Sequence, residues 1–229
     1  MPELTLLLGI DTCGPTGSVA LGRWDGQAVE ILGQIELEGR SYSSTLVAAV
    51  GELLARGGVT LREVGAIVAV SGPGSFTGVR VGLSAVKGLA EATRIPVGAV
   101  SRLEVLAAKA GVESAALDAH RHEIYMRLDS PGEPARELLA GAHELAAIYS
   151  PLPRIAICDE AAALLLASAW PRAELVRTAA PTAADALILC APRVAAGLFV
   201  DLALLDGHYL RRSDAEIFGE PATAEPLRP

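Results

Sequence analysis

The sequence lacks much of what many functions depend on. Aromatic residues make up only 4% of the 229 residues, so alanine, valine and leucine must fill the core. The chain has three cysteines and no CxxC pair, which argues against a zinc ribbon or a redox motif. Their positions, Cys13, Cys158 and Cys190, are widely separated. Such spacing is typical of free thiols in a reducing cytoplasm.

Motifs for metals and nucleophiles are also missing. The chain has four histidines, and none forms an HxxxH or HExxH pair of the kind that places zinc on a helix. The pair His120 and His122 is better explained as exposed loop histidines than as metal ligands. No GxSxG elbow and no serine or cysteine triad is recognisable, which argues against a peptidase.

Positive charge and long apolar runs are scarce as well. The 19 Lys and Arg against 27 Asp and Glu give a net charge of −8. An acidic chain is a poor candidate for binding nucleic acid alone, because phosphate contacts need clustered basic residues. It can still serve a nucleic-acid enzyme through a basic partner. The mean hydropathy is +0.39, but charged residues and Pro192 interrupt the most apolar stretch, 183–205, which indicates a buried helix rather than a membrane span.

The apolar pattern predicts an α/β protein in which two similar halves follow each other. In the first half, strands are expected at 4–10, 18–21, 28–37, 66–70 and 96–100, with helices at 43–55 and 77–93. In the second half, strands are expected at 114–117, 123–128 and 154–158, with helices at 103–110, 160–169 and 183–199. We therefore predict a first lobe over 1–101, a smaller second lobe over 102–216 and a flexible tail over 217–229. Whether the halves are a duplication is not established by the sequence.

Two glycine-rich segments are candidate phosphate-binding loops. Asp11 and Thr12 end the first strand before a turn, where a carboxylate beside N–H groups can orient a metal–phosphate group or simply cap the turn. The segment Gly72-Pro73-Gly74-Ser75 leads from a strand into a helix, whose free N–H groups can face an anion. A rigid connection with a capping hydroxyl explains it equally well, and Val79 stands where a P-loop needs lysine. The candidate residues are Asp11, Thr12, Gly72, Gly74, Ser75, Thr77 and Arg80.

The helix predicted at 77–93 carries small residues every three or four positions. They are Gly78, Gly82, Ala85, Gly88 and Ala92. Because each glycine costs roughly 1 kcal/mol relative to alanine in a helix, close approach of another backbone must offset the cost. Two alternatives stand: packing within this chain, or a helix–helix interface with another chain. Both can hold on different faces.

Several segments resemble one known family. They are LLGIDT at 7–12, GPGSFTGVRVG at 72–82, KGLA at 87–90, DAHRHEIY at 118–125 and YLRR at 209–212. Together they resemble the TsaB (YeaZ) family, a bacterial subunit of the machinery that makes N6-threonylcarbamoyladenosine at position 37 of ANN-decoding tRNAs. The match covers most of residues 4–125 and then thins until the YLRR segment.

The resemblance implies an actin-like ATPase fold of the hexokinase/Hsp70 superfamily, with two lobes that each hold a mixed sheet and helices. It implies a noncatalytic scaffold, a degenerate paralogue of TsaD, which carries the metal-binding histidines and the transfer chemistry. TsaD is then the heterodimer partner, the ATPase TsaE joins the pair, and the chain alone forms a homodimer. tRNA is reached only through the complex, in the cytoplasm. No cofactor of its own is implied, with ATP or ADP placed at the heterodimer interface.

The resemblance also implies that helices 43–55 and 77–93 contact the partner. The interface residues expected on them are Tyr42, Leu46, Val50, Gly78, Val79, Gly82, Leu83, Ala85 and Val86. On this basis Gly82→Leu should disrupt the pairing. Two positions depart from the family pattern: Tyr42 replaces a usual histidine, and 118–123 reads Asp-Ala-His-Arg-His-Glu instead of Asp-Ala-Arg-Arg-Gly-Glu. The main alternative is a nucleotide-dependent phosphotransferase or ATPase of the same fold that uses Asp11 and the Gly74 loop; a peptidase is a weaker one.

Overall fold

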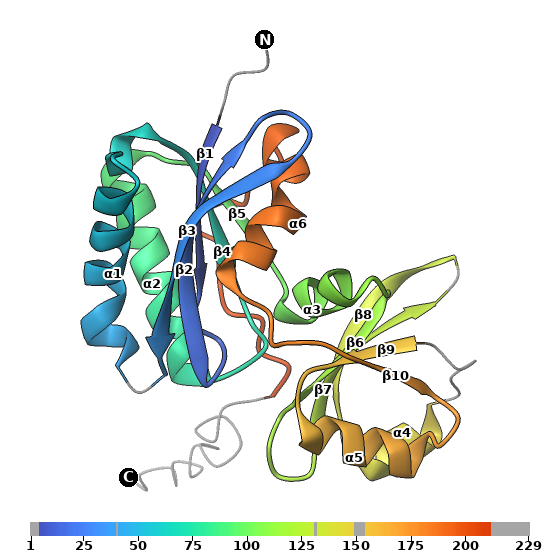
Figure 1. The fold of residues 1–229 in the computed structure, drawn as a ribbon. Helices are drawn as coiled ribbons and strands as arrows, with labels where there is room; N and C mark the ends of the chain where they lie inside the picture. Colours follow the sequence, from blue (N-terminus) through green and yellow to red (C-terminus); the bar gives the residue numbers. More distant parts are fainter. Residues whose placement is uncertain (1–4, 40, 131, 149–153, 212–229) are drawn as a thin grey trace, which may run out of the picture.

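Two five-stranded sheets organise the chain, one in each lobe (Figure 1). The structure is a computed structural model that describes residues 5–39, 41–130, 132–148 and 154–211. The tail predicted at 217–229 lies outside the described residues. None of the helices in the described ranges has both the length and the apolar character needed to cross a bilayer.

The first sheet has its most buried strand in the middle. Its order is β3-β2-β1-β4-β5, with β1 antiparallel to β2 and parallel to β4. The strands are β1 (Thr5–Asp11), β2 (Thr16–Trp24), β3 (Val29–Glu38), β4 (Val64–Val70) and β5 (Val97–Val100). Leu7, Leu8 and Ile10 are almost completely buried, because helices cover both faces of β1. The continuous apolar run at the start of the sequence is the signature of such a strand.

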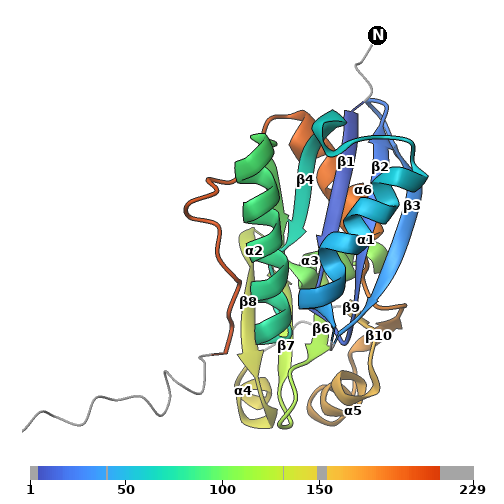
Figure 2. The same cartoon turned by 90° about the vertical axis from the view of Figure 1, so that its left-hand side faces the viewer.

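Three helices cover the first sheet. On one face lie α1 (Tyr42–Arg56) and α2 (Phe76–Thr93), side by side (Figures 1 and 2). A short 3-10 turn, Leu61–Glu63, precedes β4. On the other face lies α6 (Ala183–Ala195), which begins against the sheet because the Ala183 N–H donates to Ser18 Oγ at 2.8 Å. A Cβ at Gly9 would lie 2.7 Å from the Ala183 carbonyl oxygen, so this close approach requires glycine.

The second sheet repeats the order of the first. Its order is β10-β9-β6-β7-β8, which matches β5-β4-β1-β2-β3 strand for strand. The strands are β6 (Ser114–Asp118), β7 (Ile124–Ser130), β8 (Glu133–Ala140), β9 (Arg154–Ile157) and β10 (Glu174–Arg177). One face is covered by α3 (Arg102–Ala110), the other by α4 (Ala142–Ala147) and α5 (Glu160–Ala169). Each half therefore runs βββαβαβα, the duplication that the sequence alone left open.

The last helix of each half packs on the sheet of the other half. The chain passes from β5 into α3, which covers the second sheet, and from β10 into α6, which returns to the first sheet. This arrangement corrects the sequence-based assignment of 183–199 to the second lobe: α6 belongs to the first core, and it ends at Ala195, two residues before Gly197 turns the chain at a φ of 74°.

Three elements of the second lobe were not expected from the sequence. β8 begins with Glu133-Pro134, and proline usually signals a loop. Here β8 is an edge strand, where a residue without an N–H is tolerated. α4 and β10 span only six and four residues, too few to show a period.

The segment after α6 crosses from the first lobe to the second. We call residues 200–211 the C-terminal strap, and Figure 2 shows it running beside α2 toward β8. The Val200 N–H donates to Val97 O at 2.9 Å and the His208 N–H to Ser71 O at 2.7 Å, both in the first lobe. Arg211 Nη1 then donates to Ala119 O in the second lobe at 2.7 Å. The strap therefore fastens the lobes to each other.

Candidate functional site

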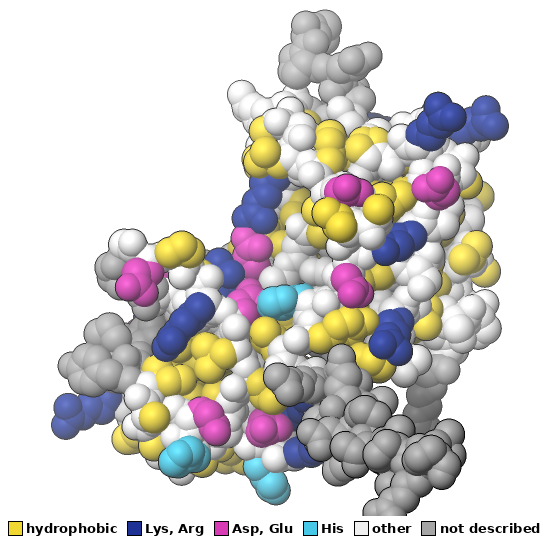
Figure 3. Space-filling view, turned by 180° about the vertical axis from the view of Figure 1, so that it is seen from behind, with side chains coloured by type: hydrophobic (Ala, Val, Ile, Leu, Met, Phe, Trp, Pro, Cys, Tyr) yellow, Lys and Arg dark blue, Asp and Glu magenta, His cyan; other side chains and the backbone are white. Residues whose placement is uncertain are grey.

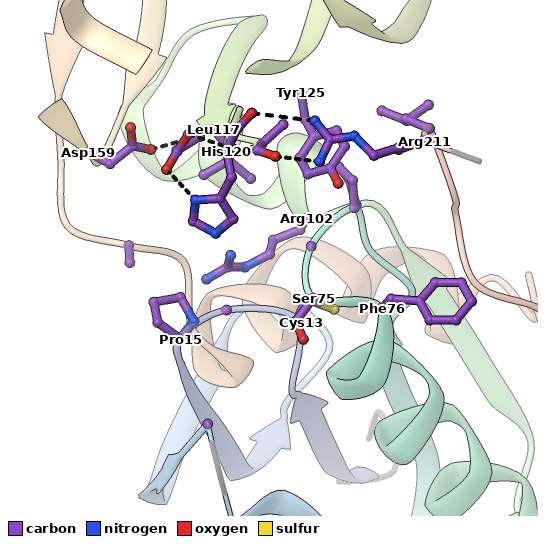
Figure 4. Close-up of a pocket in the computed structure, with 18 of the residues that line it drawn as sticks. Cys13, Pro15, Ser75, Phe76, Arg102, Leu117, His120, Tyr125, Asp159 and Arg211 are labelled. Atoms are coloured by element: carbon purple, nitrogen blue, oxygen red, sulfur yellow. Dashed lines mark hydrogen bonds and ion pairs between the residues drawn. The ribbon is translucent and has the colours of Figure 1, made fainter. Parts of the chain in front are cut away.

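A cavity of about 1020 Å³ lies between the lobes. Its walls include the turn after β1, the loop before α2, residues 117–121 at and after the end of β6, residues 158–159 after β9, and the strap (Figure 4). In a sheet of this kind, ligands bind beyond the carboxyl ends of the central strands. The cavity is therefore the place to test the predicted phosphate residues.

Asp11 lies beneath the floor of the cavity and is engaged by its own chain. Its Oδ1 accepts from the Cys13 N–H at 2.8 Å, and its Oδ2 lies 3.4 Å from Arg102 Nε. Both side chains are buried, with 1% and 7% exposed. Burial, together with the charge of Asp11, raises the pKa of the Cys13 thiol well above its usual value. The Asp11 carboxylate is thus paired with a guanidinium, and Cys13 is a neutral thiol whose Sγ donates to Val70 O at 3.3 Å.

The other predicted phosphate residues divide between structural roles and the surface. Gly74 and Ser75 line the cavity, whereas Gly72 and Thr12 are buried below it. The Thr12 hydroxyl donates to Gly78 O at 2.7 Å, and Ser75 caps α2 by accepting from the Gly78 N–H at 3.3 Å. The loop is thereby fixed to the end of β1.

Thr77 and Arg80 are exposed outside the cavity. The Arg80 guanidinium lies over the Phe76 ring, 3.7 Å from its centroid, and Phe76 contacts Tyr209 of the strap with a centroid distance of 5.0 Å. Arg80 therefore stabilises the contact between α2 and the strap, and it does not join the other predicted phosphate residues.

The residues predicted to face a partner point into this chain's own core. Tyr42, Leu46, Val50, Gly78, Val79, Gly82, Leu83 and Val86 are buried, and Ala85 is half-buried. A Cβ at Gly78 would overlap the carbonyl oxygen of Thr12, and one at Gly82 would overlap its hydroxyl. Gly82 is thus required for packing inside the chain. The prediction that Gly82→Leu would report on the partner interface is therefore wrong, because the substitution would disturb this chain's own core.

The outward faces of the same helices carry a different set of small residues. We call them the outer rows: Ser44, Ala48, Gly51 and Ala55 on α1, and Ser84, Gly88 and Ala92 on α2, all exposed. A Cβ at Gly51 or Gly88 would meet open space within 4 Å. Nothing within the described chain therefore requires glycine at these two positions. Val47, next to the row on α1, is 64% exposed.

Glu137 of β8 is a site residue that no sequence motif indicated. Only 7% of its side chain is exposed, and its carboxylate accepts from three donors: Ser101 Oγ at 2.6 Å, Arg127 Nη1 at 3.2 Å and His208 Nε2 at 2.9 Å. Burial raises the pKa of Glu137, but the hydrogen bonds from His208 and Ser101 outweigh it, so the pKa lies below the usual value. Glu137 thus joins the strap to the start of α3.

This carboxylate should make stability depend on pH. Because the pKa of Glu137 is lower in the folded chain than in the unfolded chain, its contribution is present above the ordinary glutamate pKa and is lost as the pH falls below it. We expect Glu137→Gln to lower the free energy of unfolding by about 1–3 kcal/mol at pH 7. Urea unfolding at pH 7 and near pH 4 should show the difference shrinking at the lower pH. An equal difference in unfolding free energy at the two pH values would mean that the negative charge of Glu137 does not stabilise the fold.

Comparison with known proteins shows which proteins this chain is similar to. The family model described as "TsaD: tRNA N6-adenosine threonylcarbamoyltransferase" matches residues 32–142. The TsaB protein of Haemophilus influenzae is 38% identical over 131 residues, 55% of this chain and 53% of its own length. The TsaB protein of Bacillus subtilis is 36% identical over 126 residues, which cover 53% of this chain and 54% of its own length. The chain spans about half the length of these curated relatives.

A solved structure extends the match to both lobes. YeaZ from Pseudomonas aeruginosa is 29% identical with a TM-score of 0.72, and the match covers 90% of this chain and 100% of that one. Over both lobes the chain is therefore similar to TsaB (YeaZ) proteins. Its fold is the two-lobed actin-like ATPase type, with two mixed sheets flanked by helices.

The two departures from the TsaB family pattern differ in how the structure accounts for them: Tyr42 makes a buried hydrogen bond, whereas His122 keeps a backbone conformation that favours glycine. Tyr42 is buried and donates its hydroxyl to Gly14 O at 2.8 Å, and burial, with the charge of Asp11, raises its pKa to about 12. His122, which stands at the glycine of the family pattern, has a φ of 62°. His120 and Arg121 before it also have positive φ values, so three L-residues in a row adopt a left-handed conformation.

The segment 120–122 is held in place by contacts from Asp118 and from Arg211. The His120 N–H donates to Asp118 Oδ1 at 2.7 Å, and the Arg211 side chain contacts both Ala119 O and the carboxylate of Glu123. His120 Nδ1 lies 2.9 Å from Asp118 Oδ2 with the side chain 86% exposed. Within the described residues no group of three or more potential ligands could hold a metal ion.

Proposed function

We propose that this chain is the TsaB-type subunit of a complex that makes N6-threonylcarbamoyladenosine in tRNA, and that it supports a TsaD-type transferase without carrying out the transfer. The curated relatives are named tRNA threonylcarbamoyladenosine biosynthesis proteins, and a transferase of Rhizobium meliloti is 36% identical over 115 residues. The engagement of Asp11 by Arg102 and the neutral Cys13 thiol support a noncatalytic role.

The observation that carries the proposal is the pair of outer rows. Small residues on both α1 and α2 let a partner helix approach more closely than the usual 8–10 Å between helix axes. Since neither Gly51 nor Gly88 is used inside the chain, an external helix is the physical reason for tolerating two glycines in helix interiors. The outer rows are therefore where the TsaD-type partner docks.

The other partners are proposed from the resemblance to TsaB proteins. A homodimer of the isolated chain uses the outer rows when no transferase is present, and a TsaE-type ATPase joins the heterodimer. ATP or ADP is placed at the heterodimer interface rather than on a cofactor site of this chain. The complex works in the cytoplasm, where it meets tRNA.

tRNA binds the complex and not this chain alone. The net charge is −8, and on the face seen in Figure 3 the Lys and Arg side chains are scattered among Asp and Glu instead of forming one basic patch. Phosphate contacts need such a patch. The transferase or the assembled complex therefore supplies the positive surface.

The test is reconstitution with the TsaD-type protein of the same organism. Size-exclusion chromatography with light scattering should give a larger mass for the mixture than for either protein. Threonylcarbamoyladenosine in digested tRNA, measured by mass spectrometry, should appear only when both are present. No complex, together with ATP hydrolysis by the isolated chain, would favour the alternative of a phosphotransferase.

A further inference from the structure

The outer edge of β5 is only partly paired. β5 is the last strand of the first sheet, so one of its edges has no neighbouring strand. Pro96 O and Val100 O accept hydrogen bonds from the β4 side. Because a parallel strand directs alternate residues to its two edges, the N–H and C=O groups of Val97 and Ala99 point outward. Val97 O accepts from Val200, whereas within the described residues no backbone hydrogen bond from outside the sheet reaches Ala99.

A groove of about 290 Å³ lies beside this edge of the sheet. Its lining comes from β5, from the end of α6 and from the residues after α6: Gly98, Ala99, Cys190, Arg193, Val194, Leu198, Phe199 and Val200. All of these except Arg193 are apolar or small. The charge of Arg193 is compensated, because its guanidinium pairs with the carboxylate of Glu104. The groove therefore suits apolar side chains.

The residues after α6 also present apolar side chains to solvent. Leu198 is 64% exposed, Phe199 42%, Val200 36% and Leu204 80%. Single exposed apolar residues are ordinary, but four within seven positions beside a groove indicate a contact surface. Figure 2 shows this part of the chain on the outside of the fold, next to α2.

The same stretch carries charge of one sign. Between Arg193 and Arg211 the sequence has Asp201 and Asp206 and no Lys or Arg. Asp201 follows Val200 of the groove, and both aspartates are exposed. Exposed carboxylates at the border of an apolar groove favour a ligand that carries cationic side chains beside its apolar ones.

We propose that this groove binds a short extended segment of a partner protein, in which apolar residues alternate with Lys or Arg and whose backbone pairs with Ala99. An extended backbone offers a donor and an acceptor to a strand edge and directs alternate side chains to one side. A helix cannot do so, because its N–H and C=O groups bond to each other. The apolar side chains enter the groove and the basic ones meet Asp201. The inference goes beyond the proposed function, since none of the residues that line the groove belongs to the outer rows.

Selection of peptides on the isolated full chain tests the proposal. A phage library of random linear peptides of about twelve residues is screened, and the enriched peptides are synthesised and titrated by fluorescence anisotropy. We expect alternating apolar and basic residues, and binding that weakens as salt is raised. N-methylation removes backbone donors but keeps every side chain, so methylating one alternate set of nitrogens should abolish binding and methylating the other set should not. The Ala99 N–H should exchange more slowly with solvent in the complex. Enrichment of no such pattern, or binding that neither methylation changes, would overturn the proposal.

Variants of the full chain decide whether the groove is the site. Leu198→Lys removes an apolar contact and repels a basic peptide, so it should weaken binding at least about tenfold. Leu164→Lys on α5 is the matched control: Leu164 is 65% exposed but does not line the groove, so binding should stay as in the unmodified chain. Asp201→Asn keeps the oxygen that accepts from the Ala203 N–H and removes the charge, so it should weaken binding about threefold and reduce its salt dependence. Undiminished binding by folded Leu198→Lys would overturn the assignment.

Two other occupants are separated by the same assay. A synthetic peptide of residues 212–229 that displaces the selected peptide would assign the groove to this chain's own C-terminal segment. Dimerisation of the full chain that Leu198→Lys abolishes and Leu164→Lys does not, measured by light scattering, would assign it to a second copy. Either result would overturn the proposal of a partner protein.

Discussion

Gly88→Leu should strongly weaken association with the proposed TsaD-type partner while leaving the fold intact. A side chain at this position enters open space, and replacing a glycine in an exposed helix interior should raise the free energy of unfolding by about 0.5–1 kcal/mol. At the interface the leucine would hold apart two backbones that must come close. Loss at a central contact of this kind typically costs about 2–4 kcal/mol, or roughly 30-fold to 1,000-fold in Kd.

The measurement is titration of the variant against the transferase, with thermal unfolding of the variant alone. Ala167→Leu on α5 is the matched control, since it adds leucine to an exposed helix of the second lobe and should bind normally. An unchanged Kd for Gly88→Leu would remove the outer rows as the docking surface.

Gly82→Leu, the same substitution less than two turns earlier on the same helix, should instead destabilise the chain itself. A Cβ at Gly82 would overlap the hydroxyl of Thr12, a buried residue whose hydroxyl donates to Gly78 O. Overpacking at such a fixed contact should lower the free energy of unfolding by at least about 3 kcal/mol, a large share of a typical domain's stability.

Urea unfolding of the isolated variant measures this effect without any partner. We expect a lower midpoint or an insoluble product, and Gly82→Ala should show a smaller loss in the same direction. If Gly82→Leu unfolded like the unmodified chain, the packing of α2 against Thr12 would be disproved. The pair of variants therefore separates folding from docking along a single helix.

Sequence patterns predicted the first lobe well because its elements are long and its strands continuously apolar. Leu7 and Leu8 mark a central strand, and the small residues at 78–92 mark a helix that approaches a backbone closely. In the second lobe the short elements β10 and α4 showed no period, and Pro134 concealed an edge strand. Those elements form because they pair with or pack on other parts of the second lobe, and the local residue pattern contains no sign of such contacts.

The candidate site was harder to predict because its charged residues are buried against partners that lie far away in the sequence. The Asp11 pattern indicated a phosphate or a turn cap, and only the folded chain shows Arg102 beside it, 91 positions later. Nothing local distinguishes Arg102 or Glu137 from ordinary surface charges. The spacing of small residues correctly predicted a helix at 77–93. It did not predict which face of that helix points inward, because this depends on the contact between Gly78 and Thr12, which are 66 positions apart.

The return of α6 to the first sheet has a consequence for synthesis of the protein. On the ribosome, β5 completes the strands of the first sheet 83 residues (183 − 100) before α6 begins, which at about 5–20 residues per second is a delay on the order of 4–17 s. During that time the face of the first sheet that α6 will cover has no partner, although its strands are complete. The nascent chain therefore presents an uncovered apolar sheet until α6 has been synthesised. Chaperone capture of this protein should be strongest on ribosomes stalled before codon 183.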